Sequence, residues 1–160
     1  MTLRFLPEHA ETARLMLDLA EKEAAYLAYS HGTLFDQPID LAWVEALPTR
    51  QDLAEKIDAF VSRFGRLQDH IGEKLIPRFA ALLGESPKSL LDVLAYAERM
   101  EWITSAEEFV GARRLRNLLV HEYMSNAALF LEALLAADRG ARLMLAIVDR
   151  LREQARAIGL

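Results

Sequence analysis

The stretch "RRLRNLLVHEYM", residues 113–124, brings several chemically active side chains close together among leucines. Histidine gains or loses a proton near neutral pH, and the planar guanidinium of arginine can hold two phosphate oxygens at once. His121 and Arg116 therefore offer the two functions that phosphodiester chemistry needs, a proton carrier and a fixed positive charge. Asn117 and Tyr123 extend the polar group. The stretch is either a surface helix with some polar residues or part of a reactive cleft.

RNA cleavage suits this pair because the substrate carries its own nucleophile, the 2′-hydroxyl group. The protein then has to move protons near neutral pH and stabilise the negative charge that develops on the phosphate. His121 can do the first and Arg116 the second. Two copies of the chain at a symmetric interface could supply both an acid and a base. These residue types favour a metal-independent ribonuclease.

Other catalytic arrangements have weaker support in the sequence. Ser125 follows His121 by four positions, but neither an orienting carboxylate nor an oxyanion-hole glycine stands nearby. The other histidines, His9, His31 and His70, lie far apart and share no ligand spacing with His121, so no metal ion is expected. Glycine loops that cradle phosphate are absent as well. The sequence therefore predicts no cofactor.

A helical projection of the stretch separates its leucines from its polar residues. At about 100° per residue, one sector holds Leu115, Leu118 and Leu119, which we expect to face the core. Asn117 and His121 fall in a second sector and are neighbours, because they are four positions apart. On this projection His121 does not project into the leucine stripe.

Apolar residues are mixed into the polar sector as well. Val110, Val120 and Met124 fall there, which a fully solvated face would not need. Two interpretations stay open: a partly buried polar seam where two bundles meet, or a solvated helix face. Arg113 and Arg114 are open in the same way, as RNA-phosphate contacts or as solvated charges.

The whole composition predicts an all-α fold. Alanine, leucine, glutamate and arginine dominate, only seven glycines and five prolines interrupt them, and strand-like alternation is scarce. We expect an up-and-down bundle of about five helices. The first begins after Pro7, has Leu15, Leu19 and Tyr26 among its apolar positions, and fades near residues 30–33. A connector over residues 31–48 contains a short helical turn around Trp43.

The second helix starts near Thr49, is kinked by Pro77 and ends at Gly84. Its apolar positions recur every three or four residues, as one buried face requires: Leu53, Ile57, Phe60, Phe64, Leu67 and Ile71. Ser86 and Pro87 then predict the start of a third helix. Thr104 or Ser105 caps the fourth, close to a capping box with Glu107 or Glu108. The fifth runs from about residue 126 to 157.

A few further residues invite a role. Asp69 and His70 could approach the fourth helix and support His121, although a polar stripe on a surface helix is the favoured interpretation. Trp43 and Trp102 are expected to anchor the core or an interface. Tyr26 and Tyr29 are expected to pack, with their hydroxyl groups at the rim.

Length and charge set wider limits. A chain of 160 residues, 52% of them hydrophobic, suits one domain over residues 1–160 with a substantial core. It has no cysteine, no apparent leader segment and no apolar run of membrane-spanning length, so we expect a cytoplasmic protein without membrane contact. The formal charge is −5, from 19 basic and 24 acidic residues, which leaves any nucleic-acid contact to a local basic cluster. No DNA binding is expected.

The motif "RNLLVHEY" carries a family resemblance. Arg116, four residues, His121, one residue and Tyr123 resemble the signature of the HEPN superfamily, and within it the HepT-like toxins encoded beside a minimal nucleotidyltransferase antitoxin. The segments "SRFGRLQDHIGEKLIPRFAALLGE" and "SLLDVLAYAERMEWITSAEEF" are similar to members of that group. The resemblance covers roughly residues 50 to 150.

The resemblance implies a role for each motif residue. Arg116 and His121 would form the ribonuclease centre of a homodimer in which two motifs share one cleft, with Asn117 as the polar residue that accompanies them. Tyr123 matches the tyrosine that the partner nucleotidyltransferase modifies with adenylate. A bulky anionic adenylate there would block the cleft and repel RNA phosphates. The RNA substrate could be one end of a tRNA.

Two features depart from the typical short toxin: the connector over residues 31–48 and the long alanine-rich last helix. Either could alter the dimer or cover the cleft. The main alternative function is a non-catalytic helical partner of the nucleotidyltransferase, which docks it and presents or senses a nucleotide. A purely structural helical protein is a third possibility.

Overall fold

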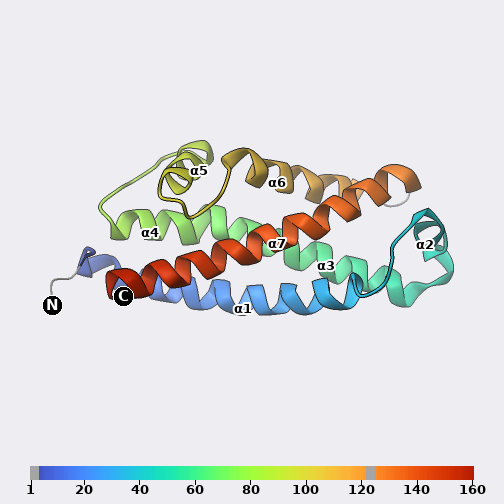
Figure 1. Cartoon of the computed structure of the whole chain (residues 1–160), viewed down its shortest axis with the longest axis horizontal. Helices are drawn as coiled ribbons and strands as arrows, with labels where there is room; N and C mark the ends of the chain where they lie inside the picture. Colours follow the sequence, from blue (N-terminus) through green and yellow to red (C-terminus); the bar gives the residue numbers. More distant parts are fainter. Residues whose placement is uncertain (1–3, 122–124) are drawn as a thin grey trace.

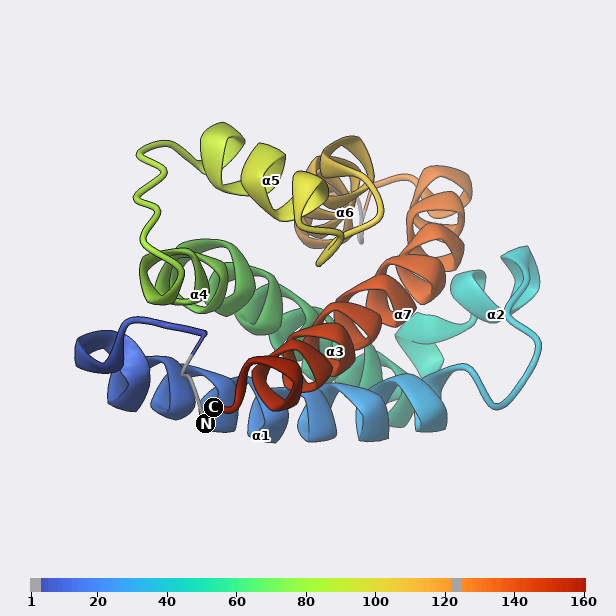
Figure 2. The ribbon, with the colours of Figure 1, turned by 60° about the vertical axis from the view of Figure 1, so that its left-hand side comes forward.

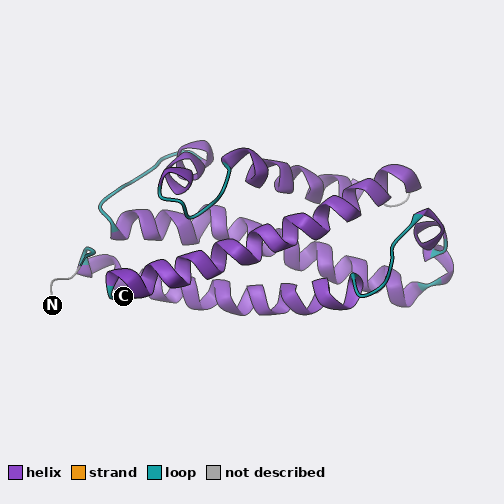
Figure 3. Ribbon diagram, viewed as in Figure 1, coloured by secondary structure: helices purple, strands orange, loops and turns teal. Residues whose placement is uncertain are grey.

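The computed structural model describes residues 4–121 and 125–160, without the side chain of His121. Within those ranges the chain forms helices and loops and no strand (Figure 3), so the all-α prediction is confirmed. None of the helices in the described part is both long enough and apolar enough to cross a membrane.

The longer helices run alternately in opposite directions along the long axis (Figure 1). α1, α3 with α4, α6 and α7 form the body of the bundle, α5 lies across α6, and the short α2 sits at the end away from the termini. Figure 2 shows α5 and α6 together on the side opposite α1. The bounds are α1 Ala10–Leu34, α2 Leu41–Glu45, α3 Gln51–His70, α4 Ile76–Leu82, α5 Leu90–Arg99, α6 Ala106–His121 and α7 Ala127–Ile158.

The amphipathic pattern of α3 predicted its buried face correctly. All six apolar positions expected from the spacing are buried, five of them in α3 and Ile71 directly after it: Leu53, Ile57, Phe60, Phe64, Leu67 and Ile71. Burying a side chain of this size stabilises the fold by about 1.5–3 kcal/mol. α3 uses this face against α1, which is the most extensive helix contact in the described part of the chain. α3 is thus held in place by α1 and can support α6, which also packs against it.

α1 turns a different face inward from the one that its large side chains suggested. Leu15 and Tyr26 are 54% and 58% exposed, and Leu19 and Tyr29 are exposed as well. The buried face carries small residues between leucines: Ala10, Ala13, Leu17, Ala20, Leu27 and Leu34. Alanine lets helix backbones approach closely, and α1 packs against α3, α4 and α7. The expectation that both tyrosines pack was therefore wrong for Tyr29, whereas the centroid of the Tyr26 ring lies 5.2 Å from the guanidinium carbon of Arg63.

Several helix boundaries also differ from the prediction. α1 continues to Leu34, so the connector begins four residues later than residue 31. α5 begins at Leu90 with Ser89 as its cap, whose hydroxyl accepts a hydrogen bond from the Asp92 N–H at 3.1 Å. The predicted start at Ser86 and Pro87 was wrong, because those residues lie in the loop before that cap.

The break expected near Pro77 takes the form of a π-helical segment, Ile71–Leu75. The Ile76 N–H donates to the Ile71 carbonyl, five residues back. Pro77 directly follows this segment within the same continuous helix, and it has no N–H to donate to the preceding turn. Gly84 ends the unit with a φ of 86°, a left-handed conformation that favours glycine.

Candidate functional site

α6, which carries the motif, is held firmly at its start. The Ser105 hydroxyl accepts a hydrogen bond from the Glu108 N–H at 3.2 Å, which confirms Ser105 as the cap. A carboxylate from α5, Glu98, accepts from the Ala106 N–H at 2.7 Å. This second cap joins α5 to α6 and satisfies a helix N–H that would otherwise lack a partner. The acidic groups also suit the positive end of the helix dipole.

The buried face of α6 is rotated from the predicted leucine stripe. Phe109, Ala112 and Leu119 are buried, whereas Leu115 and Leu118 are only half-buried. On the helical projection these three buried residues flank the direction of Arg116, so the arginine lies on the packed face. All three predicted leucines contact the core, but only Leu119 is fully buried.

Arg116 can occupy that face because α3 presents a glycine opposite it. A Cβ atom on Gly65 would stand 2.5 Å from Arg116 Nε and 2.8 Å from its Cζ. The missing side chain therefore forms the notch in which the guanidinium lies. Nη1 of Arg116 donates to both carboxylate oxygens of Asp69, each at 2.9 Å. Gly65 and Asp69 are four residues apart, so one face of α3 supplies both the space and the ion-pair partner.

The prediction that Asp69 and His70 form a surface polar stripe was wrong for both residues. Asp69 is half-buried against Arg116, as described above. His70 is buried, and its Nε2 donates to the Met16 carbonyl of α1 at 2.8 Å. Because a carbonyl only accepts, this nitrogen carries the proton. His70 thus ties α3 to α1, while Asp69 orients the motif arginine.

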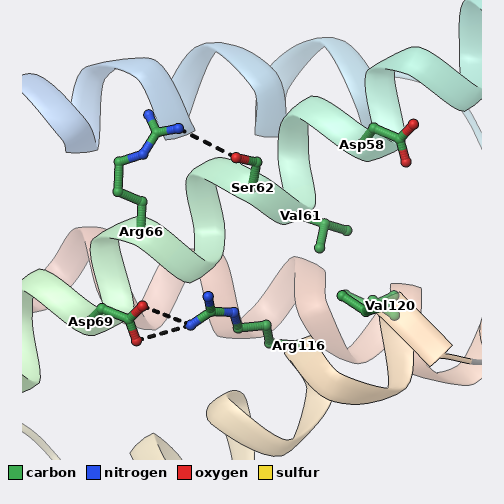
Figure 4. Close-up of a pocket in the computed structure, with 8 residues that line it drawn as sticks. Asp58, Val61, Ser62, Arg66, Asp69, Arg116 and Val120 are labelled. Carbon is green, nitrogen blue, oxygen red and sulfur yellow. Dashed lines mark hydrogen bonds and ion pairs between the residues drawn. The ribbon is translucent and has the colours of Figure 1, made fainter.

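A pocket of about 570 Å³ opens where Arg116 meets α3 (Figure 4). Asp58, Val61 and Asp69 contribute from α3, and Arg116, Leu119 and Val120 from α6. Arg66, on the same rim, donates instead to the Ser62 hydroxyl at 3.3 Å, one turn back along α3. This α3–α6 pocket therefore combines two guanidinium groups, of which Arg116 is oriented by Asp69, with two carboxylates and an apolar wall.

A second pocket, of about 320 Å³, lies on the other side of Arg116, between α5 and α6. Arg116 and Asn117 border it, and Arg113 and Arg114 line it. Among the described residues, neither Arg113 nor Arg114 forms an ion pair. Nη1 of Arg113 is buried and has no hydrogen-bond partner. Arg116 thus separates two pockets of different character.

The end of the connector lines a third pocket. Leu47 and Pro48 line a pocket of about 590 Å³ together with Asn126, the cap of α7. Asp58 borders this pocket and the α3–α6 pocket alike. The connector therefore lies beside Asn126 and Ala127, at the start of α7.

The structure places the predicted site residues unevenly. Arg116 is half-buried and held, Arg113 is half-buried, and Asn117 and Arg114 are exposed. His121 is the last residue of α6, but its side chain lies outside the described part of the chain, as does all of Tyr123. The pairing of His121 with Ser125 is untested for the same reason. Within the described ranges, no group of three or more histidine, aspartate or glutamate side chains could hold a metal ion.

Sequence reasoning missed Gly65 and Gln68. Gln68 is completely buried between α3 and α6, and its Nε2 donates to the Ala112 carbonyl at 3.2 Å. One signal was available: a glycine and a glutamine interrupt the strong amphipathic pattern of α3 four and one positions before Asp69. Such interruptions often mark a close approach of another helix.

Comparison with known proteins gives this chain no relative. No protein-family model matches it. Neither the search of curated proteins nor the search of solved structures returned a match. The motif and the geometry around Arg116 are the features that indicate a function.

Proposed function

We propose that this chain is a HEPN-like, metal-independent endoribonuclease toxin that acts as a homodimer in the cytoplasm. The observation that carries the proposal is the arrangement of Arg116. This arginine stands five positions before His121 on one helix, is oriented by Asp69, and borders a pocket of about 570 Å³. Only its Nη1 is bonded to Asp69, so within the described residues Nε and Nη2 keep donors for a phosphate.

In the proposed reaction the 2′-oxygen of one RNA residue attacks its own 3′-phosphate. The new 2′-O–P bond forms as the P–O5′ bond breaks, giving a 2′,3′-cyclic phosphate and a 5′-hydroxyl group. His121 takes the proton from the 2′-hydroxyl or gives one to the leaving 5′-oxygen, and the partner copy supplies the other step. Arg116 stabilises the extra negative charge of the pentavalent phosphorus. Asn117, exposed beside Arg116, orients the substrate or His121.

Regulation belongs to the same proposal. Tyr123 follows His121 by two positions, and a minimal nucleotidyltransferase partner would attach adenylate to its hydroxyl group. The added phosphate would repel RNA from the cleft. Intact-mass measurement of the protein made with and without that partner tests this step. We expect one added adenylate on the wild type and none on Tyr123→Phe.

The ribonuclease activity is tested with purified His121→Ala and a tRNA mixture in the presence of EDTA. Loss of the proton carrier should lower the cleavage rate by about 10²–10⁴-fold. Circular dichroism and size-exclusion chromatography check that the fold and the dimer persist. His9→Ala is the matched control, because His9 lies in the turn before α1, and it should cleave like the wild type. Equal cleavage by His121→Ala would end the catalytic assignment.

One observation favours the alternative of a non-catalytic partner subunit. Asp69 already compensates part of the Arg116 charge, and Asp58 adds a second negative charge to the pocket. A subunit that only docks a nucleotidyltransferase would tolerate this. Such a protein would bind its partner but would neither cleave RNA nor inhibit growth when expressed alone.

A further inference from the structure

Three arginines and no carboxylate line the α5–α6 pocket, whereas Asp58 and Asp69 line the α3–α6 pocket. Arg50, Arg116, Arg142 and Arg152 each form an ion pair with a carboxylate. Arg113 and Arg114, which are neighbours in this pocket, form none among the described residues. Two adjacent guanidinium groups in a pocket whose lining has no carboxylate make that pocket a favourable place for an anion.

The burial of Arg113 strengthens that indication. Its Nη1 is buried and has no hydrogen-bond partner. A buried charged donor without a partner is costly, and an anionic oxygen that entered the pocket would remove that cost. Arg114 is exposed at the rim, where it can meet the same anion from solvent.

Gln68 requires a hydrogen-bond donor from a ligand, whereas Arg113 requires an acceptor. Gln68 is 0% exposed, and its Nε2 is already bonded to the Ala112 carbonyl of α6. That bond fixes the amide, so Oε1 remains as a buried acceptor without a partner. A ligand that satisfies this pocket must therefore present a donor, an N–H or an O–H, as well as anionic oxygens. A nucleotide has both, in its phosphate and in its base or 2′-hydroxyl group.

The remaining wall is apolar. Leu90 and Val110 are half-buried, and Leu91 is 69% exposed, among the most exposed large apolar side chains in the described part of the chain. A flat base can cover such a wall on one face, and a guanidinium plane can stack on its other face. The volume of about 320 Å³ is at the small end for ligand pockets. It suits one nucleotide unit.

We propose that the α5–α6 pocket is a nucleotide subsite, which holds one single-stranded RNA residue beside the bond that is cleaved. Arg113 and Arg114 bind its phosphate, Leu90, Leu91 and Val110 contact its base, and Gln68 Oε1 accepts a hydrogen bond from it. Arg116 borders this pocket and the α3–α6 pocket alike, so an RNA strand that crosses Arg116 reaches both. The proposal rests on the proposed ribonuclease function for its choice of RNA.

The test is binding of a fluorescein-labelled, fully 2′-O-methylated RNA hexamer, which lacks the attacking hydroxyl, to the full chain by fluorescence anisotropy. Arg113→Gln and Arg114→Gln should each raise Kd by about tenfold, the loss expected for one charged hydrogen bond. Arg114 is exposed, so its variant keeps the fold even if the Arg113 variant does not. For the double variant, the slope of log K against log salt should fall by about 1.4, since each contact with single-stranded RNA contributes about 0.7.

The matched control is Arg156→Gln. Arg156 lies with Arg14 and Arg152 in a pocket of about 240 Å³ between α1 and α7, which also contains Asp18. In Figure 1 that end of α7 lies beside α1, far along the bundle from α6. This variant removes the same charge and should leave Kd unchanged. An equal loss at Arg156 would mean non-specific attraction and would overturn the subsite.

Two competition experiments complete the test. Uridine and adenosine monophosphates should displace the hexamer at lower concentration than inorganic phosphate does, because the base contributes. Equal competition by inorganic phosphate, or tighter binding of a hexaglutamate peptide, would overturn the nucleotide subsite in favour of a plain anion site or an acidic protein partner.

The two proposals can fail separately. If His121→Ala cleaves like the wild type while binding still depends on Arg113 and Arg114, the ribonuclease assignment is lost and the subsite stands. If cleavage depends on His121 but the KM for RNA is unchanged in the Arg113 and Arg114 variants, the subsite proposal is lost and the ribonuclease proposal stands.

Discussion

The two pockets on either side of Arg116 hold their positive charge in opposite ways. In the α3–α6 pocket the guanidinium lies in the Gly65 notch and donates twice to Asp69, so it is both oriented and partly neutralised. In the α5–α6 pocket, Arg113 and Arg114 have no carboxylate partner among the described residues, and Arg113 keeps an unpaired buried donor.

The difference suggests a division of labour. A group that stabilises a transition state works best when it is fixed beforehand, because no reorganisation is needed as the reaction proceeds. A group that captures a substrate gains more from a charge that nothing inside the protein already satisfies. The α3–α6 pocket meets the first condition and the α5–α6 pocket the second.

Gly65→Ala should have the largest effect on the α3–α6 pocket, because it removes the fixed orientation of Arg116. The clash of 2.5 Å is with the end of a flexible side chain, so the guanidinium moves and the helices stay. Displacement of a catalytic group by about 1 Å can cost on the order of 10²-fold in rate. We expect RNA cleavage to fall by about 10- to 100-fold while RNA binding persists. The thermal midpoint should change by no more than about 3 °C, because the gain in helix propensity offsets the lost ion pair.

Gly111→Ala is the matched control on the motif helix. A Cβ at Gly111 meets nothing within 4 Å, so the variant should keep full cleavage. It should also be more stable by about 0.5–1 kcal/mol, as alanine replaces glycine inside a helix. Full cleavage by Gly65→Ala would show that the notch does not matter to the site.

Asp69→Asn should have the next largest effect. The half-exposed pair contributes no more than about 1 kcal/mol to stability, so the fold should hold. Without the carboxylate, Arg116 loses its fixed direction, and we expect kcat to fall by about tenfold. KM should fall as well, because one negative charge leaves a pocket that RNA enters. Steady-state kinetics separate the two parameters.

Asp58→Asn serves as the control for charge in the same pocket. Asp58 is exposed and, among the described residues, forms no bond with Arg116. It should lower KM without lowering kcat. A similar loss of kcat in both variants would mean that Asp69 acts through charge and not through orientation.

Gln68→Leu tests the α5–α6 pocket, and we expect its effect to be the smallest of these variants. The change removes a buried acceptor that has no partner, which usually outweighs one long hydrogen bond. We expect stability to rise by about 1 kcal/mol and the thermal midpoint by about 2–4 °C. RNA affinity should fall at the same time. A more stable variant that binds RNA better would argue against a ligand contact at Gln68.

The fold was predictable where apolar and charged residues alternate clearly along a helix. The six expected apolar positions from Leu53 to Ile71 stand out because charged residues separate them, and all of them are buried. α1 offered no such contrast, since alanine and leucine occur on every side, and close packing then selected the small residues Ala13 and Ala20. Ser86, followed by Pro87, resembled a helix start more than Ser89 does, yet Ser89 forms the cap.

The candidate site was predictable only in its residue types. The position of Arg116 on the packed face of α6 contradicts the leucine periodicity, because the space for it comes from Gly65, on another helix. The sequence of α6 alone cannot indicate that α3 has a glycine opposite Arg116. The same holds for Gln68, whose partner Ala112 lies on the opposite helix.

The π-helical segment Ile71–Leu75 has a consequence for chain length. A π-turn stores one surplus residue in an otherwise regular helix. Because Glu73 and Lys74 within it are exposed, deleting one of them together with Pro77→Ala should let the turn close into ordinary α-helix. The residues on either side would keep their facing, so Asp69 would still meet Arg116 and Phe79 would still point inward. A homologous chain one residue shorter at this point, and without a proline at position 77, would be expected to keep the same three-dimensional arrangement.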